Sequence, residues 1–134
     1  MPKSWVEKRD GHKKKSHITK LEKKFAGIPE GSHLLISSPQ EIDEYIRSLD
    51  EGSLVTTQEM RGALALKHKV EATCPVSSGI FLRIVCEAAL EERASGKALD
   101  DITPFWRIDL AGTTAAKKLS IDEDEVALLR EMRP

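Results

Sequence analysis

Between residues 38 and 96 the apolar positions recur every three or four residues, the spacing of amphipathic helices. The first helix is predicted from residue 39 to about residue 49, because Ser38 can cap it, Pro39 suits the first helical position and Glu41 completes a capping box. Its inward positions are Ile42, Tyr45, Ile46 and Leu49. Residues 50–52, Asp-Glu-Gly, are expected to end it.

Two further helices follow in the same block. A second capping box, residues 56–59, predicts a helix whose inward positions are Met60, Ala63, Leu64 and Ala65. Cys74 precedes a proline and therefore avoids the helical region, so the third helix is expected to begin after it, capped by Ser77 or Ser78. Gly96 closes that helix, and its apolar positions are Ile80, Phe81, Ile84, Val85, Ala88 and Ala89.

The remaining segments have a weaker pattern. Residues 1–30 are polar, with a short helix predicted over 16–25, and residues 33–37 form an apolar run that is typical of a strand. Residues 101–109 are predicted to form a turn and then a strand, and two short helices are expected over 115–119 and 120–132, the second capped by Ser120 with Glu123. The sequence therefore predicts a mostly α fold with a small β element. Three helices, a strand and a turn in this order indicate a winged helix-turn-helix, whose third helix can enter a DNA groove.

The chain has 134 residues, which corresponds to one domain. It contains no apolar stretch long enough to span a membrane, and residues 1–15 lack the apolar core of a secretory signal. Only two cysteines are present, too few for a disulfide scaffold. We therefore expect a cytoplasmic protein with no membrane partner.

The net charge of −1 conceals a strong asymmetry. Residues 1–24 hold nine Lys and Arg against three acids, a charge of +6, and the rest of the chain carries −7. We divide the chain into a basic, partly flexible arm, residues 1–30, and a winged-helix domain, residues 31–134. The run Lys13, Lys14 and Lys15 either contacts phosphates or is a solvated terminus. With six aromatic residues in all, a stacking platform for single strands is disfavoured.

Residues 41–119 resemble the DNA-binding domain of the alkylguanine-DNA alkyltransferases. Three segments carry the resemblance: residues 49–60 are similar to the family's Pro-x-Gly-x-Val-Thr-Tyr-Gly-Glu-Ile motif, residues 75–79 to its Ala-Arg-Ala-Val-Gly motif, and residues 103–108 to its active-site Pro-Cys-His-Arg-Val motif. The resemblance implies a winged-helix domain that binds duplex DNA.

The resemblance also implies which chemistry this chain lacks. The family's alkyl-accepting cysteine falls on Phe105 and its activating histidine on Trp106, so no thiolate nucleophile is available there. The alkyltransferase-like proteins, which have an aromatic residue in place of the cysteine, bind alkylated DNA without repairing it. The tyrosine that rotates the nucleotide falls on Thr57, and the arginine that fills the vacated stack falls on Val76.

The candidate site follows from these positions. By family position, the base pocket consists of Thr57, Val76, Phe105, Trp106 and Arg107. In an extended segment, alternation would turn one of the two aromatic residues outward, so we expect a cleft lined by Thr57, Val76, Ser77, Phe105 and Arg107. Taken residue by residue, however, we favour the core over the pocket for both aromatic residues, and a structural role over ligand contact for Arg107.

The candidate DNA contacts are Thr57, Ser77, Ser78, Arg83 and the three lysines 13–15. The two serines and the helix N-terminus can hold a phosphate, and Arg83 is able to read a guanine edge with two hydrogen bonds. The alternative for Arg83 is an ordinary surface arginine.

The cysteines and histidines offer a weaker case for chemistry. Cys74 lies just ahead of a predicted helix, where the helix dipole favours a reactive thiolate, whereas Cys86 is expected to be a small buried apolar residue. The four histidines have no metal-ligand spacing, and no glycine-rich phosphate loop is present, so neither a metal nor a cofactor is expected.

Three functions remain open from the sequence. The first is a non-enzymatic duplex-DNA-binding protein, related to the alkyltransferase-like proteins, that senses alkylated or damaged bases. The second is a winged-helix protein-interaction module whose acidic body meets a basic partner, and the third is an enzyme that uses Cys74. We expect a monomer in each case.

Overall fold

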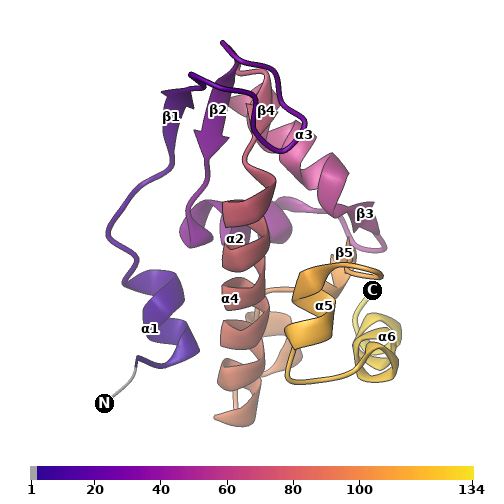
Figure 1. Ribbon diagram of the computed structural model, residues 1–134. Helices are drawn as coiled ribbons and strands as arrows, with labels where there is room; N and C mark the ends of the chain where they lie inside the picture. Colours follow the sequence, from indigo (N-terminus) through magenta and orange to yellow (C-terminus); the bar gives the residue numbers. More distant parts are fainter. Residues whose placement is uncertain (1–2) are drawn as a thin grey trace.

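The computed structural model describes residues 3–134 and shows a mostly helical chain with small β elements (Figure 1). The first half contains α1 (Trp5–Asp10), β1 (His17–Lys20), β2 (His33–Ile36), α2 (Pro39–Ser48), β3 (Val55–Thr56) and α3 (Thr57–Lys67). The second half contains β4 (Ala72–Thr73), α4 (Pro75–Ala94), the 3-10 turns η1 (Leu99–Asp101) and η2 (Phe105–Arg107), β5 (Ile108–Asp109), α5 (Thr114–Lys118) and α6 (Glu123–Met132).

Helix α4 is the centre of the molecule. Figure 1 shows α1 on one side of it and α5 on the other, with α2 crossing behind. From Leu82 onward its inward positions are buried in one apolar cluster with residues of α2, α3, η2 and α6. The first two turns are different, because Val76 and Ile80 are 56% and 57% exposed. The N-terminal part of the central helix is therefore open to a ligand.

The strands form two small sheets. In the first, β1 pairs antiparallel with β2, and β2 pairs parallel with β4, so that Leu34 lies opposite Ala72. In the second, β3 and β5 pair in parallel, which joins the start of α3 to the segment after η2. The predicted strand over residues 33–37 is confirmed, whereas the predicted helix over 16–25 is wrong. Residues 17–20 of that segment instead extend along the open edge of β2.

Local capping signals define α2 and α3 as predicted. The Ser38 side chain accepts a hydrogen bond from the Glu41 backbone, and Thr56 and Glu59 form a complete capping box. The capping box predicted for α2 is not completed, because the Glu41 carboxylate accepts from Ser16 and the Ser38 backbone N–H donates to the Ser16 hydroxyl. Two other predicted caps are wrong. Helix α4 begins at Pro75, whose ring fixes the helical φ at the first position, and the N-cap Cys74 makes no side-chain cap bond. Helix α6 is capped by Asp122, since Ser120 donates its hydroxyl to Glu87 instead.

The basic N-terminal segment contributes two elements to this packing. Helix α1 lies along α4, and β1 supplies the outer strand of the first sheet. The boundary placed at residue 30 therefore does not coincide with a gap in the packing. Within residues 3–134, no helix has both the length and the apolar character that a bilayer crossing requires.

Candidate functional site

A cleft of about 720 Å³ lies over the open part of α4. Helix α1 forms one wall, the start of α5 the other, and α3 the end near the sheets. Apolar side chains line the part against α4, among them Met60, Val76 and Ile80. At 720 Å³ the cleft is within the size range of ligand-binding sites.

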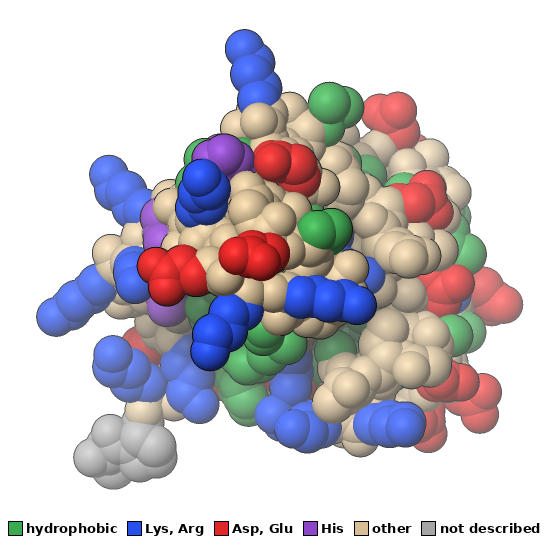
Figure 2. Space-filling model, turned by 45° about the horizontal axis from the view of Figure 1, so that its top comes forward, with side chains coloured by type: hydrophobic (Ala, Val, Ile, Leu, Met, Phe, Trp, Pro, Cys, Tyr) green, Lys and Arg blue, Asp and Glu red, His purple; other side chains and the backbone are tan. Residues whose placement is uncertain are grey.

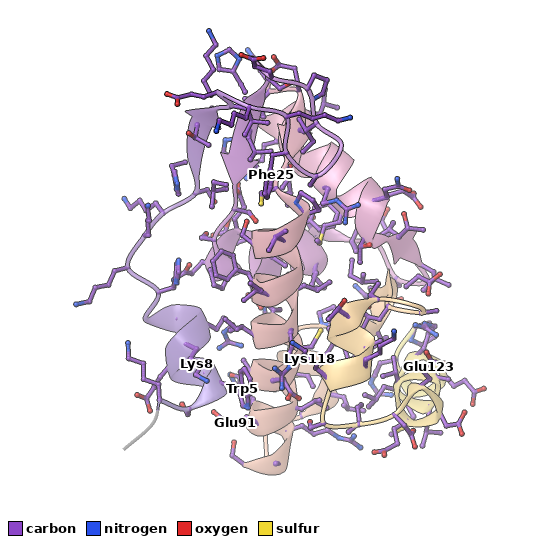
Figure 3. The ribbon with its side chains drawn as sticks, in the orientation of Figure 1. Trp5, Lys8, Phe25, Glu91, Lys118 and Glu123 are labelled. Carbon is purple, nitrogen blue, oxygen red and sulfur yellow. The ribbon has the colours of Figure 1, made fainter. Side chains whose placement is uncertain are left out.

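The charged side chains that line the cleft have one sign. Four cationic residues line it, and of residues 3–134 no aspartate or glutamate does; the four are Lys8, Arg61, Arg83 and Lys118. Figure 2 shows several Lys and Arg side chains along the lower edge of the molecule, while Asp and Glu side chains lie at its right and in the middle of the face. In Figure 3, Lys8 and Lys118 lie on opposite sides of α4, and Glu123 lies away on α6. The cleft is therefore suited to an anion.

The corner between α1 and α4 holds two of these cations against one aromatic ring. The Lys8 ammonium lies 4.2 Å from the centroid of the Trp5 ring, and the Arg83 guanidinium carbon lies 5.0 Å from it. These distances are in the range of cation–π attraction. Glu87, one helical turn along, contacts Arg83 at 3.7 Å.

Four of the sequence-predicted residues line the cleft: Thr57, Val76, Ser78 and Arg83. Ser77 does not line it, and its buried hydroxyl has no hydrogen-bond partner. Ser78 is buried and donates its hydroxyl to the Pro75 carbonyl within the first turn of α4. The lysines 13–15 are exposed in the connection between α1 and β1 and do not line the cleft.

Phe105 and Trp106 are both core residues. They are 0% and 1% exposed, with their rings edge to face at 5.4 Å, and the Trp106 indole N–H donates to the Arg133 carbonyl. The expected alternation is wrong because the segment forms the 3-10 turn η2, in which successive side chains do not alternate between two faces. Phe105 therefore does not reach the cleft.

Arg107 is occupied elsewhere. Its guanidinium donates to the carbonyl oxygens of Leu49 and Pro134, and with Trp106 it borders a separate depression of about 460 Å³. The predicted single cleft of Thr57, Val76, Ser77, Phe105 and Arg107 is therefore wrong: Thr57 and Val76 lie at one site and Arg107 at another.

The site residues that sequence reasoning missed are Trp5, Lys8, Arg61 and Lys118. Trp5 and Lys8 are three residues apart, a helical spacing, but the predicted elements left residues 5–10 without a helix. Lys118 belongs to a helix that was predicted, yet only the packing of α5 beside α4 brings it to the cleft.

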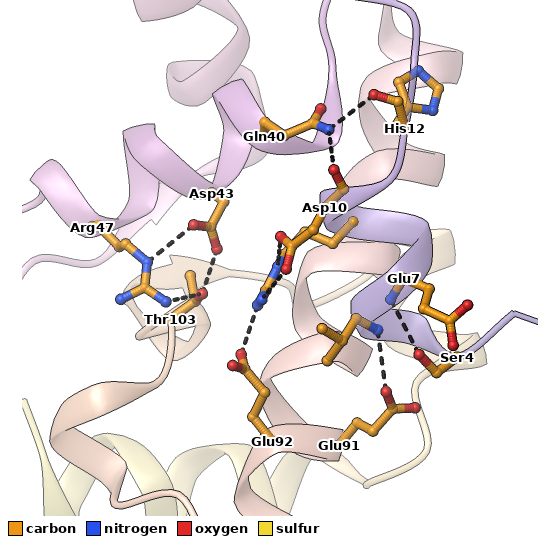
Figure 4. A network of polar contacts seen from close by, with 12 residues as sticks. Ser4, Glu7, Asp10, His12, Gln40, Asp43, Arg47, Glu91, Glu92 and Thr103 are labelled. Carbon is orange, nitrogen blue, oxygen red and sulfur yellow. Dashed lines mark hydrogen bonds and ion pairs between the residues drawn. The ribbon is translucent and has the colours of Figure 1, made fainter.

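Helix α1 is fixed on α4 by polar contacts (Figure 4). The backbone N–H groups of Trp5 and Val6 donate to the Glu91 carboxylate, which caps the start of α1 from outside. Arg9 donates to Glu92 at 2.6 Å, and both side chains are at most 10% exposed. The Gln40 amide of α2 donates to two carbonyls at the end of α1. The wall that carries Trp5 and Lys8 is thus held in place at both ends.

Two buried carboxylates stay charged through their partners. Burial alone would raise the pKa of Glu92, but its hydrogen bonds with Arg9 and Lys97 outweigh burial and lower it. Burial likewise opposes ionisation of Glu41, and hydrogen bonds from Ser16, His68 and Lys67 together lower its pKa. Both carboxylates join the N-terminal segment to the rest of the chain.

We expect the protein to lose stability in acid. A carboxylate with a lowered folded pKa stabilises the fold above its ordinary value of 4.5 and ceases to do so as the pH falls through the lowered value. Thermal melting followed from neutral pH to about pH 3 should therefore show a falling midpoint below about pH 4.5, with a smaller acid dependence in Glu92→Gln. A midpoint that stays constant to pH 3 would show that these ion pairs do not hold the fold.

The cysteines and histidines form no reactive pair. Cys74 is buried at the N-cap of α4, and His68, the histidine nearest to it in sequence, contacts Glu41 at 2.7 Å instead. Burial raises the pKa of the Cys86 thiol. Among residues 3–134, no group of three or more His, Cys, Asp or Glu side chains is arranged to hold a metal ion.

The cleft combines cationic side chains with an apolar lining, an arrangement that can bind an anion with an apolar part.

Comparison of the chain with models of protein families, with curated proteins and with solved structures finds no match.

Proposed function

We propose that this chain is a non-enzymatic duplex-DNA-binding protein that resembles the alkyltransferase-like proteins. In this proposal α3 and α4 act as a winged helix-turn-helix, and the cleft over the start of α4 receives the DNA. One observation carries the proposal: among residues 3–134, four cations and no acid line the cleft, in a chain with 21 basic and 22 acidic residues.

The charge distribution supports DNA over a neutral ligand. Phosphate contacts provide most of the non-specific affinity of DNA-binding proteins. Lys8 and Lys118 lie on the two walls of the cleft, with the exposed turns of α4 between them. The acids Glu123, Asp124 and Glu125 at the start of α6 lie outside the cleft, so they do not oppose an approaching duplex there.

The geometry argues against alkyl transfer at the family's position. Phe105 has no nucleophilic atom and is buried in the core, and the tryptophan beside it is buried as well. What this site offers a damaged base is contact with apolar side chains such as Val76 and Ile80. Sensing of alkylated bases is therefore proposed as binding alone.

The test is a titration with duplexes that differ in one alkylated guanine, each at two salt concentrations. We expect binding that weakens as salt rises, because the contacts are to phosphates. Tighter binding of the alkylated duplex would support damage sensing, and equal binding would restrict the function to duplex DNA. Absence of salt-dependent binding to either duplex would contradict the proposal.

The lysine run supplies a separate prediction. Replacing Lys13, Lys14 and Lys15 by Gln should lower the slope of log affinity against log salt by up to about 3, since each phosphate contact contributes about 0.9. These side chains are exposed, so folding should be unaffected, which thermal melting checks. A slope equal to that of the unchanged protein would show that the run is a solvated segment.

The second candidate function is a protein-interaction module. One observation favours it: α6 exposes Leu128 and Met132, one helical turn apart, beside three acids in its first turn. Such a surface suits a basic partner with apolar side chains. A protein that binds neither duplex would move this candidate ahead.

A further inference from the structure

Trp5 is a large aromatic residue within a polar, charged segment, and it lines the cleft. Helix α1 presents it to the cleft, where Lys8 and Arg83 both approach its ring, at 4.2 Å and 5.0 Å from the centroid. Its backbone N–H is held by Glu91, which fixes the start of α1 on α4. Trp5, Lys8 and Arg83 are called the Trp5 corner below.

Two like charges share this ring. Each cation is attracted to the ring, but the two positive charges repel each other, and solvent screens part of this repulsion because Lys8 is exposed. No acid lines the cleft among the residues described, and Glu87 contacts Arg83 at 3.7 Å from outside it. An anion between Lys8 and Arg83 would turn this repulsion into two attractions.

Arg83 also has hydrogen-bonding capacity to spare. Its Nε is shielded from solvent and has no hydrogen-bond partner. The adjacent Glu87 contacts it at 3.7 Å, whereas the other oxygen of Glu87 accepts two hydrogen bonds from Ser120. A guanidinium has five donors arranged to meet two oxygens of one phosphate. Because the Nε is shielded from solvent, a phosphate would meet this guanidinium through its terminal nitrogens, of which Nη2 contacts Glu87.

We propose that the Trp5 corner binds a phosphodiester group of duplex DNA, with Lys8 and Arg83 donating to its oxygens and Trp5 positioning both cations. The proposal rests on the proposed function, since DNA is the source of the phosphate. It places α1, outside the domain predicted from the sequence, in the binding site. In this proposal Arg83, which was expected from the sequence to read a guanine edge, contacts a phosphate instead.

The experiment measures duplex affinity against salt for Lys8→Gln, Arg83→Gln, Trp5→Phe and Trp5→Ala. Lys8→Gln and Arg83→Gln should each lower the salt slope by about 1, the value of one phosphate contact. Trp5→Ala should weaken binding by several-fold, and Trp5→Phe should retain most of the affinity because a ring remains to hold the cations.

The matched control is Arg93→Gln. Arg93 is exposed on the same helix, about 15 Å farther along its axis, and does not line the cleft. It removes the same charge as Arg83→Gln and should leave the slope unchanged. Thermal melting of all variants separates loss of binding from loss of folding. Because Lys8 is exposed on α1, Lys8→Gln should disturb the core least.

Tryptophan emission reports on the corner directly. The chain has two tryptophans, and Trp106 is 1% exposed, so acrylamide quenching reports chiefly on Trp5. Duplex DNA should protect Trp5 from the quencher in the unchanged protein and less so in Arg83→Gln.

The outcomes distinguish this inference from the proposed function. If the duplex binds but the slopes of Lys8→Gln and Arg83→Gln equal that of Arg93→Gln, the Trp5 corner is not a phosphate site, and DNA binding stands without it. If no duplex binds, the proposed function fails, and titration with inorganic pyrophosphate then tests whether the Trp5 corner binds an anion. Protection of Trp5 by pyrophosphate that Arg83→Gln abolishes supports an anion site for another phosphate source, and no protection overturns the inference.

Discussion

Phe105→Ala should lower the free energy of unfolding by about 3–5 kcal/mol, the usual cost of truncating a buried phenylalanine. The ring is fully buried at the junction of η2 with the central cluster, and it packs edge to face on Trp106. Truncation leaves a void among well-packed neighbours, which the surrounding helices can only partly fill. Urea denaturation of the variant and of the unchanged protein gives the difference directly.

Leu66→Ala is the matched control for that measurement. Its side chain is 79% exposed on α3, so the expected change is within about 0.5 kcal/mol. Duplex affinity of Phe105→Ala, measured at a temperature where it remains folded, should be unchanged because the ring does not line the cleft. A variant that melts normally but loses affinity would place Phe105 in a working base pocket and overturn the assignment to the core.

The elements that the sequence predicted correctly are those with local signals. Helices α2 and α3 are capped by Ser38 and Thr56, whose side chains accept hydrogen bonds from the backbone N–H three residues on, so each start signal lies within four residues. The strand β2 has an apolar run, and its Leu34 and Leu35 are both buried. These signals are independent of the rest of the fold.

The elements that were missed depend on partners far along the chain. Helix α1 is short, and its first backbone N–H groups are satisfied by Glu91, more than 80 residues away in sequence. Strand β1 has only Ile18 as an apolar residue, 47% exposed, so backbone pairing with β2 rather than burial defines it. No window of the sequence contains these contacts.

The candidate site was half predictable for the same reason. Resemblance singled out Thr57 and Val76, the chemistry of the third helix singled out Ser78 and Arg83, and all four line the cleft. It also placed Phe105 in the pocket, but the backbone of η2 directs that ring into the core. Lys8 and Lys118 reach the cleft only because α1 and α5 pack on either side of α4.

Arg9→Ala is expected to have the second largest effect, a loss of about 3 kcal/mol, at the lower end of the cost of breaking a buried ion pair. The Arg9 side chain is 8% exposed, and its partner Glu92 is 10% exposed. Truncation leaves the Glu92 carboxylate buried with Lys97 as its remaining cation, at 2.6 Å, which is why the expected cost is not larger. Urea denaturation measures the loss.

Two further variants test whether the loss of stability in Arg9→Ala comes from the buried ion pair with Glu92. Asp10→Asn removes the other partner of Arg9, but that carboxylate is 60% exposed, so the expected loss is below about 1 kcal/mol. Adding Glu92→Gln to Arg9→Ala should restore part of the stability, because no unpaired charge is then buried. Since Arg9 holds the helix that carries Trp5 and Lys8, Arg9→Ala should also weaken duplex binding while the rest of the chain stays folded. If Arg9→Ala melts and binds DNA like the unchanged protein, α1 is held on α4 without the ion pair between Arg9 and Glu92.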